Sequence, residues 1–144
     1  MSFLWDVFEF IVTIFEAFVL THFICGFLGH KFKTKKEKII YILGSIGYAI
    51  IVIIFNRITI FEGFLGIVYS LYYFLYALFF LKGRVIKKLL ASILENLIMV
   101  FTSTLGASIA STAFHIDIID IYTKSGIERF IGVIVVQILL VYVY

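Results

Sequence analysis

Long apolar runs that carry few charges dominate the chain and constrain its fold more than any other feature. About 20 apolar residues in a helix cross the hydrocarbon core of a bilayer, whereas strand spans would be about half as long and would alternate. Hydrophobic residues make up 63% and charged residues only 15% of the 144 positions, against about 25% charged in soluble domains. We therefore predict an all-α, polytopic membrane bundle over residues 1–144, without a soluble domain. Its five spans lie at about 4–28, 39–55, 61–81, 89–110 and 127–144.

The basic residues between the spans predict the orientation of the chain. Nine of them fall in the segments after the first and third spans: Lys31, Lys33, Lys35, Lys36, Lys38, Lys82, Arg84, Lys87 and Lys88. The opposite side carries only Arg57, Lys124 and Arg129. By the positive-inside rule the nine-residue side is cytoplasmic, so the N-terminus is expected outside. Lipid headgroups account for these charges, and we expect membrane lipid but no nucleic acid as a partner.

Span one carries a polar stripe. At 100° per residue, Asp6, Glu9, Thr13 and Glu16 fall on one side of a helix. An ionised side chain in the bilayer is costly, so Glu16, about halfway down the span, should be protonated, be paired, or face a watery cavity. Glu9, Thr13 and Glu16 are therefore candidates for ligand binding or signal coupling, with a structural hydrogen bond as the alternative.

Span four has a second polar face. Glu95 and Asn96 lie toward its cytoplasmic end, where Lys87 or Lys88 would reach them, and they are further candidates for signal coupling. Small residues allow close approach of helix backbones. The small residues that predict helix packing on this face are Ser103, Gly106, Ala107 and Ala110.

Three tyrosines share one face of span three. Tyr69, Tyr73 and Tyr76 run through the middle of the span rather than lying at the headgroups, so their hydroxyls need partners inside the bundle. Glu16 is one possible partner. The tyrosines predict either packing with internal hydrogen bonds or the lining of a pocket for an apolar ligand.

No metal, cofactor or catalytic group is predicted. His115, Asp117 and Asp120 in the outer loop lack a fourth ligand, so this trio is weak evidence for metal. The loop alternates isoleucine with polar residues, which favours a short amphipathic segment at the membrane interface.

Several segments of the chain resemble a known family. They are Trp5-Asp6-x-x-Glu9, Glu16-Ala17-Phe18, Tyr72-Tyr73-Phe74-Leu75-Tyr76-Ala77-Leu78, Lys82-Gly83-Arg84 with Lys87-Lys88, and Ile121-Tyr122-Thr123-Lys124-Ser125-Gly126-Ile127-Glu128-Arg129. Together they resemble the N-terminal membrane region of AgrC-like histidine kinases of Gram-positive bacteria, which carry a GHKL ATPase domain. The resemblance implies a bacterial, multi-pass, dimeric receptor for an extracellular peptide. The phosphoacceptor histidine and nucleotide-binding boxes of the family are absent, so this chain itself is not expected to be an enzyme.

We therefore expect a membrane-embedded sensor module of a two-component signalling kinase, which passes a signal by helix rearrangement. One alternative is a small transport or channel subunit that uses Glu16 and Glu95 as proton or cation sites. Spans two and five argue against it, because Ser45 and Gln137 are nearly their only internal polar groups. The other alternative is a non-catalytic interaction protein, such as an immunity or assembly factor.

Overall fold

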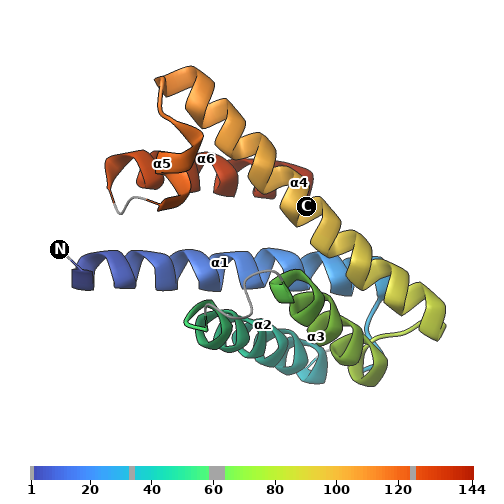
Figure 1. The fold of residues 1–144 in the computed structure, drawn as a ribbon. Helices are drawn as coiled ribbons and strands as arrows, with labels where there is room; N and C mark the ends of the chain where they lie inside the picture. The colour runs from blue at the N-terminus through green and yellow to red at the C-terminus, as the bar shows by residue number, and fades with distance from the viewer. Residues whose placement is uncertain (1, 33–34, 59–63, 124–125) are drawn as a thin grey trace.

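A computed structural model describes residues 2–32, 35–58, 64–123 and 126–144 as a bundle of helices (Figure 1). In chain order the helices are α1 (Ser2–Leu28), α2 (Lys35–Asn56), α3 (Leu65–Phe80), α4 (Val85–Phe114), α5 (Ile118–Thr123) and α6 (Ile127–Val143). The described residues form no β-strand, only an isolated bridge between His30 and Leu81. The prediction of an all-helical chain is confirmed.

Three of the helices are long and apolar enough to cross a membrane: Phe3–Leu28, Lys35–Asn56 and Val85–Phe114. Helices α3 and α6 have 16 and 17 residues and are shorter than a typical span. Part of the predicted third span, residues 61–63, lies outside the described residues. The structure thus supports a membrane protein with three candidate spans, and the count of five remains a prediction.

Two helices extend beyond the predicted spans. Helix α2 begins at Lys35 rather than at 39, and α4 runs over Val85–Phe114 rather than 89–110. The hydropathy of the sequence marks only the part of a helix that suits hydrocarbon, whereas backbone hydrogen bonding continues into the headgroup region. Lysine side chains tolerate this position because their long stems reach toward water.

Helix α1 lies between two groups of helices. It contacts α2 and α3 on one side and α4 and α6 on the other, and α4 crosses the bundle to contact α3, α5 and α6 as well (Figure 1). Side chains that are fully buried between α1, α2 and α3 form the core: Ala17, Leu20, Ile24, Tyr48, Tyr73 and Ala77. Large apolar side chains cover the outside of the bundle, as expected where the solvent is lipid.

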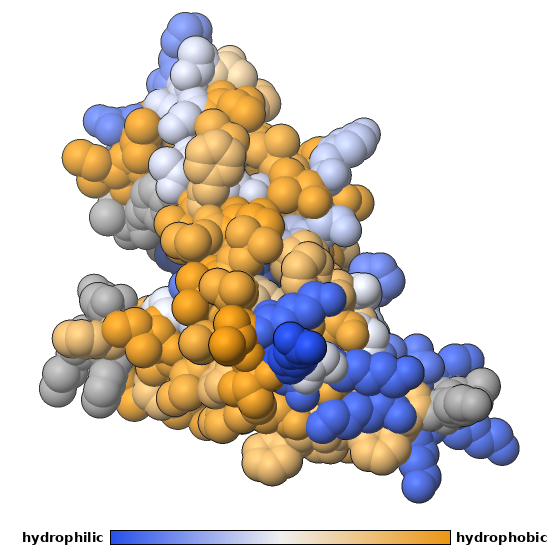
Figure 2. All heavy atoms as spheres, turned by 90° about the vertical axis from the view of Figure 1, so that its right-hand side faces the viewer, coloured by the Kyte–Doolittle hydropathy of each residue, from blue (hydrophilic) through white to orange (hydrophobic). Residues whose placement is uncertain are grey.

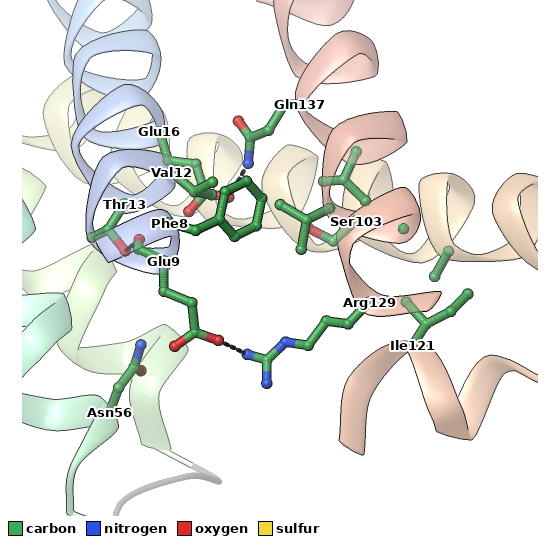
Figure 3. Close-up of a pocket in the computed structure, with 14 residues that line it drawn as sticks. Phe8, Glu9, Val12, Thr13, Glu16, Asn56, Ser103, Ile121, Arg129 and Gln137 are labelled. Carbon is green, nitrogen blue, oxygen red and sulfur yellow. Dashed lines mark hydrogen bonds and ion pairs between the residues drawn. The ribbon is translucent and has the colours of Figure 1, made fainter. Parts of the chain in front are cut away.

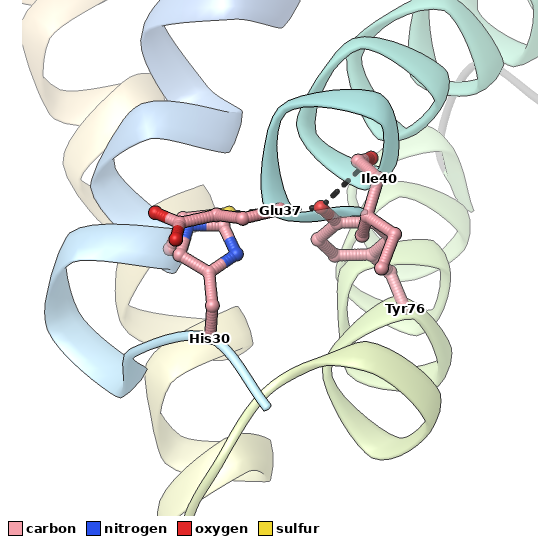
Figure 4. Close-up of polar contacts among 5 residues, drawn as sticks. His30, Glu37, Ile40 and Tyr76 are labelled. Carbon is pink, nitrogen blue, oxygen red and sulfur yellow. Dashed lines mark hydrogen bonds and ion pairs between the residues drawn. The ribbon is translucent and has the colours of Figure 1, made fainter. Parts of the chain in front are cut away.

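Tyrosine hydroxyls join α3 to α1 and α2. The hydroxyl of Tyr73 lies 3.2 Å from Oγ1 of Thr21, and that of Tyr76 donates to the carbonyl of Ile40 at 3.1 Å (Figure 4). Tyr69 donates to Oδ1 of Asn56 at 3.1 Å. The tyrosines therefore have internal partners, but Glu16 is not among them.

Small residues of α4 lie against α6. A Cβ atom added to Gly106 would come within 2.5 Å of Cγ2 and 3.0 Å of Cα of Val136. Gly106, Ala107 and Ala110 are buried, and Ser103 is half-buried on the same face. The residues predicted for helix packing thus lie where the backbones of α4 and α6 approach closely.

The segment between α4 and α6, predicted as an outer loop, folds in part as the short helix α5. Oδ1 of Asp117 accepts a hydrogen bond from the backbone N–H of Ile119, which helps to begin the helix. Ile121 is buried, whereas Ile118 and Ile119 are exposed. Within the described residues, no three His, Cys, Asp or Glu side chains lie close enough together to hold a metal ion.

Candidate functional site

A cavity of about 260 Å³ opens between α1, α4 and α6 in the half of the bundle that contains the start of α1 (Figure 3). Asn56 of α2 and Ile121 of α5 complete its wall. Its apolar lining consists of Phe8, Val12, Ala107, Ile121, Gly132, Val133 and Val136. Its polar lining consists of Glu9, Thr13, Glu16, Asn56, Ser103, Arg129 and Gln137. A cavity with both kinds of lining suits an amphipathic ligand, because apolar contacts give affinity and a few polar groups fix orientation.

Glu16 and Gln137 meet at the deep side of this cavity. Nε2 of Gln137 donates a hydrogen bond to Oε1 of Glu16 at 2.5 Å, and this contact joins the middle of α1 to α6 (Figure 3). Oε1 of Gln137 is buried and has no hydrogen-bond partner among the described residues. A buried acceptor without a donor is costly. A ligand that places an N–H or O–H group here would therefore donate a hydrogen bond to Oε1 of Gln137.

A second polar contact, an ion pair, joins α1 to α6 at the other side of the cavity. Nη2 of Arg129 lies 2.5 Å from Oε1 of Glu9, and Nε1 of Trp5 donates to the same oxygen at 2.9 Å. The guanidinium of Arg129 lies over the Trp5 ring, 5.6 Å from its centroid. Both side chains of the ion pair are partly exposed, at 33% and 41%. The contact therefore orients the start of α6 on α1 more than it stabilises the fold, because exposed ion pairs contribute only about 0–1 kcal/mol.

Thr13 lies between these two polar contacts. Its hydroxyl donates to the backbone carbonyl of Glu9 within α1, at 2.8 Å. The hydroxyl proton is thus already used, and the oxygen can still accept a hydrogen bond from a ligand. Acceptors therefore outnumber free donors on the α1 side of the cavity.

The predicted stripe of span one is brought together with residues that sequence reasoning did not single out. Glu9, Thr13 and Glu16 all line the cavity, but their partners Arg129 and Gln137 come from α6. The sequence does contain a pattern that points to these partners. Arg129, Val133 and Gln137 are four residues apart and therefore share one face of a helix. Gln137 is nearly the only internal polar group of span five, and the structure pairs it with Glu16.

The other predicted site residues lie outside this cavity. Glu95 is buried, with Oε2 lacking a hydrogen-bond partner in the described part of the chain. Asn96 donates to the carbonyl of Gly66 at 3.1 Å and so joins α4 to α3. From the sequence, Lys88 could reach Glu95. In the structure Lys88 instead donates to the carbonyl of Leu78 at 3.4 Å. Tyr69, Tyr73 and Tyr76 act in helix packing instead of lining this cavity.

Close packing ends the cavity toward the other half of the bundle. Beyond Glu16 along α1, the side chains of Leu20, Thr21 and Ile24 are fully buried, and the hydroxyl of Tyr73 from α3 lies 3.2 Å from that of Thr21. The lining of the cavity therefore ends at Glu16, about halfway along α1.

No comparison with protein-family models, curated proteins or solved structures found a match for this chain.

Proposed function

We propose that the chain is the membrane-embedded sensor module of a bacterial two-component signalling kinase and that it detects an extracellular, lipophilic signal, such as a peptide. The observation that carries this proposal is the amphipathic cavity beside the start of α1. It opens at one end of the bundle, ends at mid-depth, and lies between α1, α4 and α6. Inside it, the polar side chains of α1 and α6 meet at Glu16–Gln137 and Glu9–Arg129, so a ligand there would touch the contacts that join these two helices.

The proposed orientation places the cavity on the outer side of a bacterial membrane. The basic segments between α1 and α2 and between α3 and α4 lie together at the opposite end of the bundle, where hydrophilic residues gather in Figure 2. By the positive-inside rule that end is cytoplasmic. The short helices α3 and α6 complete five crossings in this topology, which is multi-pass with the N-terminus outside.

The proposed mechanism is a population shift between two positions of α6 relative to α1. A ligand that fills the cavity and bonds to Gln137 favours the position that best fits it. Moving such an equilibrium from mostly off to mostly on requires a differential binding free energy of about 5 kcal/mol. Apolar contacts with Val12, Val133 and Val136 together with one or two hydrogen bonds are of that order, at about 25 cal/mol per Å² buried. In a homodimeric receptor, the shift would be passed to a kinase domain on the cytoplasmic side.

Transport is the second candidate, favoured by the half-buried carboxyl group of Glu16 and the buried one of Glu95. A conduit would need a polar cavity that continues across the bundle. The lining of this cavity includes Glu16 but does not reach Glu95. An interaction protein of the immunity or assembly type would need the helix contact faces but not the cavity.

Ligand binding can be tested with the fluorescence of Trp5, the only tryptophan of the chain. Its ring contacts Glu9 and Arg129 at the cavity entrance, so occupancy should change its emission. The purified chain in lipid nanodiscs is titrated with a set of short hydrophobic peptides, both linear and cyclic. We expect at least one peptide to give a saturable change in emission.

Two neighbouring substitutions provide the matched comparison. Val12→Phe fills the cavity, whereas Ile11→Phe places the same aromatic side chain at an exposed position that does not line it. We expect Val12→Phe to abolish the saturable response and Ile11→Phe to keep it. An equal response in both variants, or no saturable response to any peptide, would contradict the proposal. Proton or cation flux through proteoliposomes that Glu16→Gln abolishes would instead favour transport.

A further inference from the structure

Backbone hydrogen bonds join the two basic segments at the end opposite the cavity into one platform, which we define as residues 29–31 and 80–83. The backbone N–H of Lys82 donates to the carbonyl of Gly29 at 2.9 Å, and that of Lys31 donates to the carbonyl of Phe80 at 3.2 Å. Gly29 and Gly83 have φ values of 77° and 108°, in the left-handed region that favours glycine. The platform therefore brings the backbones of Lys31 and Lys82 together at the junction of α1, α3 and α4.

Two lysine ammonium groups converge on one backbone oxygen beside this platform. Nζ of Lys31 lies 2.7 Å and Nζ of Lys88 3.4 Å from the carbonyl oxygen of Leu78, and Nζ of Lys31 also lies 3.4 Å from that of Phe79. The residue Lys88 is only 4% exposed. Two neutral carbonyl groups in the last turn of α3, even with the partial negative charge of a helix C-terminus, cannot neutralise two full positive charges.

No carboxylate of the described residues lies within ion-pair distance of either ammonium group. Glu37, the acidic residue nearest this end in sequence, instead lies 3.4 Å from Nε2 of His30 (Figure 4). A helix C-terminus would need only one lysine to cap this carbonyl. A nearly buried, uncompensated second cation therefore indicates that an anion belongs at this position.

We propose that Lys31 and Lys88 bind the phosphate of an acidic phospholipid headgroup. A phosphate has enough acceptor oxygens to take hydrogen bonds from both ammonium groups. The surroundings favour a lipid as its source, because Phe79, Val85 and Ile86 expose 68%, 58% and 72% of their surface immediately beside the platform. Acyl chains can lie along these side chains while the phosphate sits at the lysines, at the level where the apolar helix surfaces end.

The proposal is tested on the purified full chain in nanodiscs of phosphatidylcholine with or without phosphatidylglycerol. Cys25 is the only cysteine and is 4% exposed, so its labelling by a thiol-reactive dye during heating reports unfolding. We expect phosphatidylglycerol to raise the unfolding midpoint of the wild-type chain. Lys31→Gln and Lys88→Gln should each remove most of this shift, measured between lipids within the same variant so that any general loss of stability cancels.

Lys36→Gln is the matched control, because Lys36 is an exposed lysine at the same end without a place in the platform. It makes the same change in net charge and should keep the shift. An equal loss in Lys31→Gln and Lys36→Gln would show diffuse attraction of a basic surface and overturn the proposal. Inorganic phosphate that reproduces the shift in phosphatidylcholine would overturn the lipid source, and no shift with phosphatidylglycerol would overturn the site itself.

Discussion

Replacing Gly106 by alanine tests the contact between α4 and α6 on which the cavity depends. The added Cβ would lie 2.5 Å from Cγ2 and 3.0 Å from Cα of Val136, and ordinary van der Waals contact begins at 3.4 Å. A side-chain methyl group can move, but the Cα atom belongs to the backbone of α6. The two helices must therefore separate by several tenths of an ångström.

The expected cost follows from three contributions. Overpacking of a well-packed contact costs about 1–3 kcal/mol. Alanine returns up to about 1 kcal/mol through its higher helix propensity. Separation also weakens the hydrogen bond between Glu16 and Gln137, and such bonds between membrane helices contribute about 0.6 kcal/mol on average. We expect the free energy of unfolding to fall by about 1–2 kcal/mol.

The assay is reversible unfolding in mixed detergent micelles as the fraction of sodium dodecyl sulfate is raised. Gly26→Ala is the matched control, because an added Cβ at Gly26 in α1 would meet no atom within 4 Å. That variant should keep or slightly raise stability. If Gly106→Ala proves as stable as Gly26→Ala, the close approach of α4 and α6, and with it the outline of the cavity, is refuted.

Two further predictions concern single polar contacts. Arg129→Gln should change stability by no more than about 1 kcal/mol, since the ion pair with Glu9 is partly exposed. The substitution should nevertheless shift the fluorescence emission of Trp5, measured in nanodiscs, because Arg129 lies over the Trp5 ring. It should also make that emission independent of the salt concentration. Tyr73→Phe, combined with Thr21→Val in a double-mutant cycle, should give a coupling free energy of about 0.6 kcal/mol. A coupling of zero in mixed-micelle unfolding would contradict the hydrogen bond between the two buried hydroxyls.

The helices of this chain could be predicted because their signal is local. Runs of apolar residues without proline identify helices, and a stripe at 100° per residue places Glu9, Thr13 and Glu16 on one side of α1. These three residues do line one cavity. The need of the span-three tyrosines for internal partners could also be predicted, because a buried hydroxyl requires one.

The partners themselves could not be predicted, because they are set by how the helices pack. A helix that is apolar all round has no strongly preferred face, so its sequence does not show which side meets which neighbour. From the sequence, Glu16 is one possible partner of the α3 tyrosines, but α1 turns that side chain toward Gln137 of α6. Thr21, about 1.4 turns further along α1, faces α3 and lies within hydrogen-bond distance of the Tyr73 hydroxyl instead.

Helix α6 links the cavity to the opposite half of the bundle. Gln137 binds Glu16 near the middle of α1. After the end of α6, the hydroxyl of Tyr144 donates to the backbone carbonyl of Glu95 at 2.7 Å, and its ring packs edge-on against Phe23 at 4.9 Å. A continuous helix is stiff along its axis, so a ligand that displaces α6 at the cavity must also shift the contact of Tyr144 with α4. The cavity side chains and the tyrosine therefore report one motion, and a spin label at each end of α6 should respond to the same peptide at the same concentration.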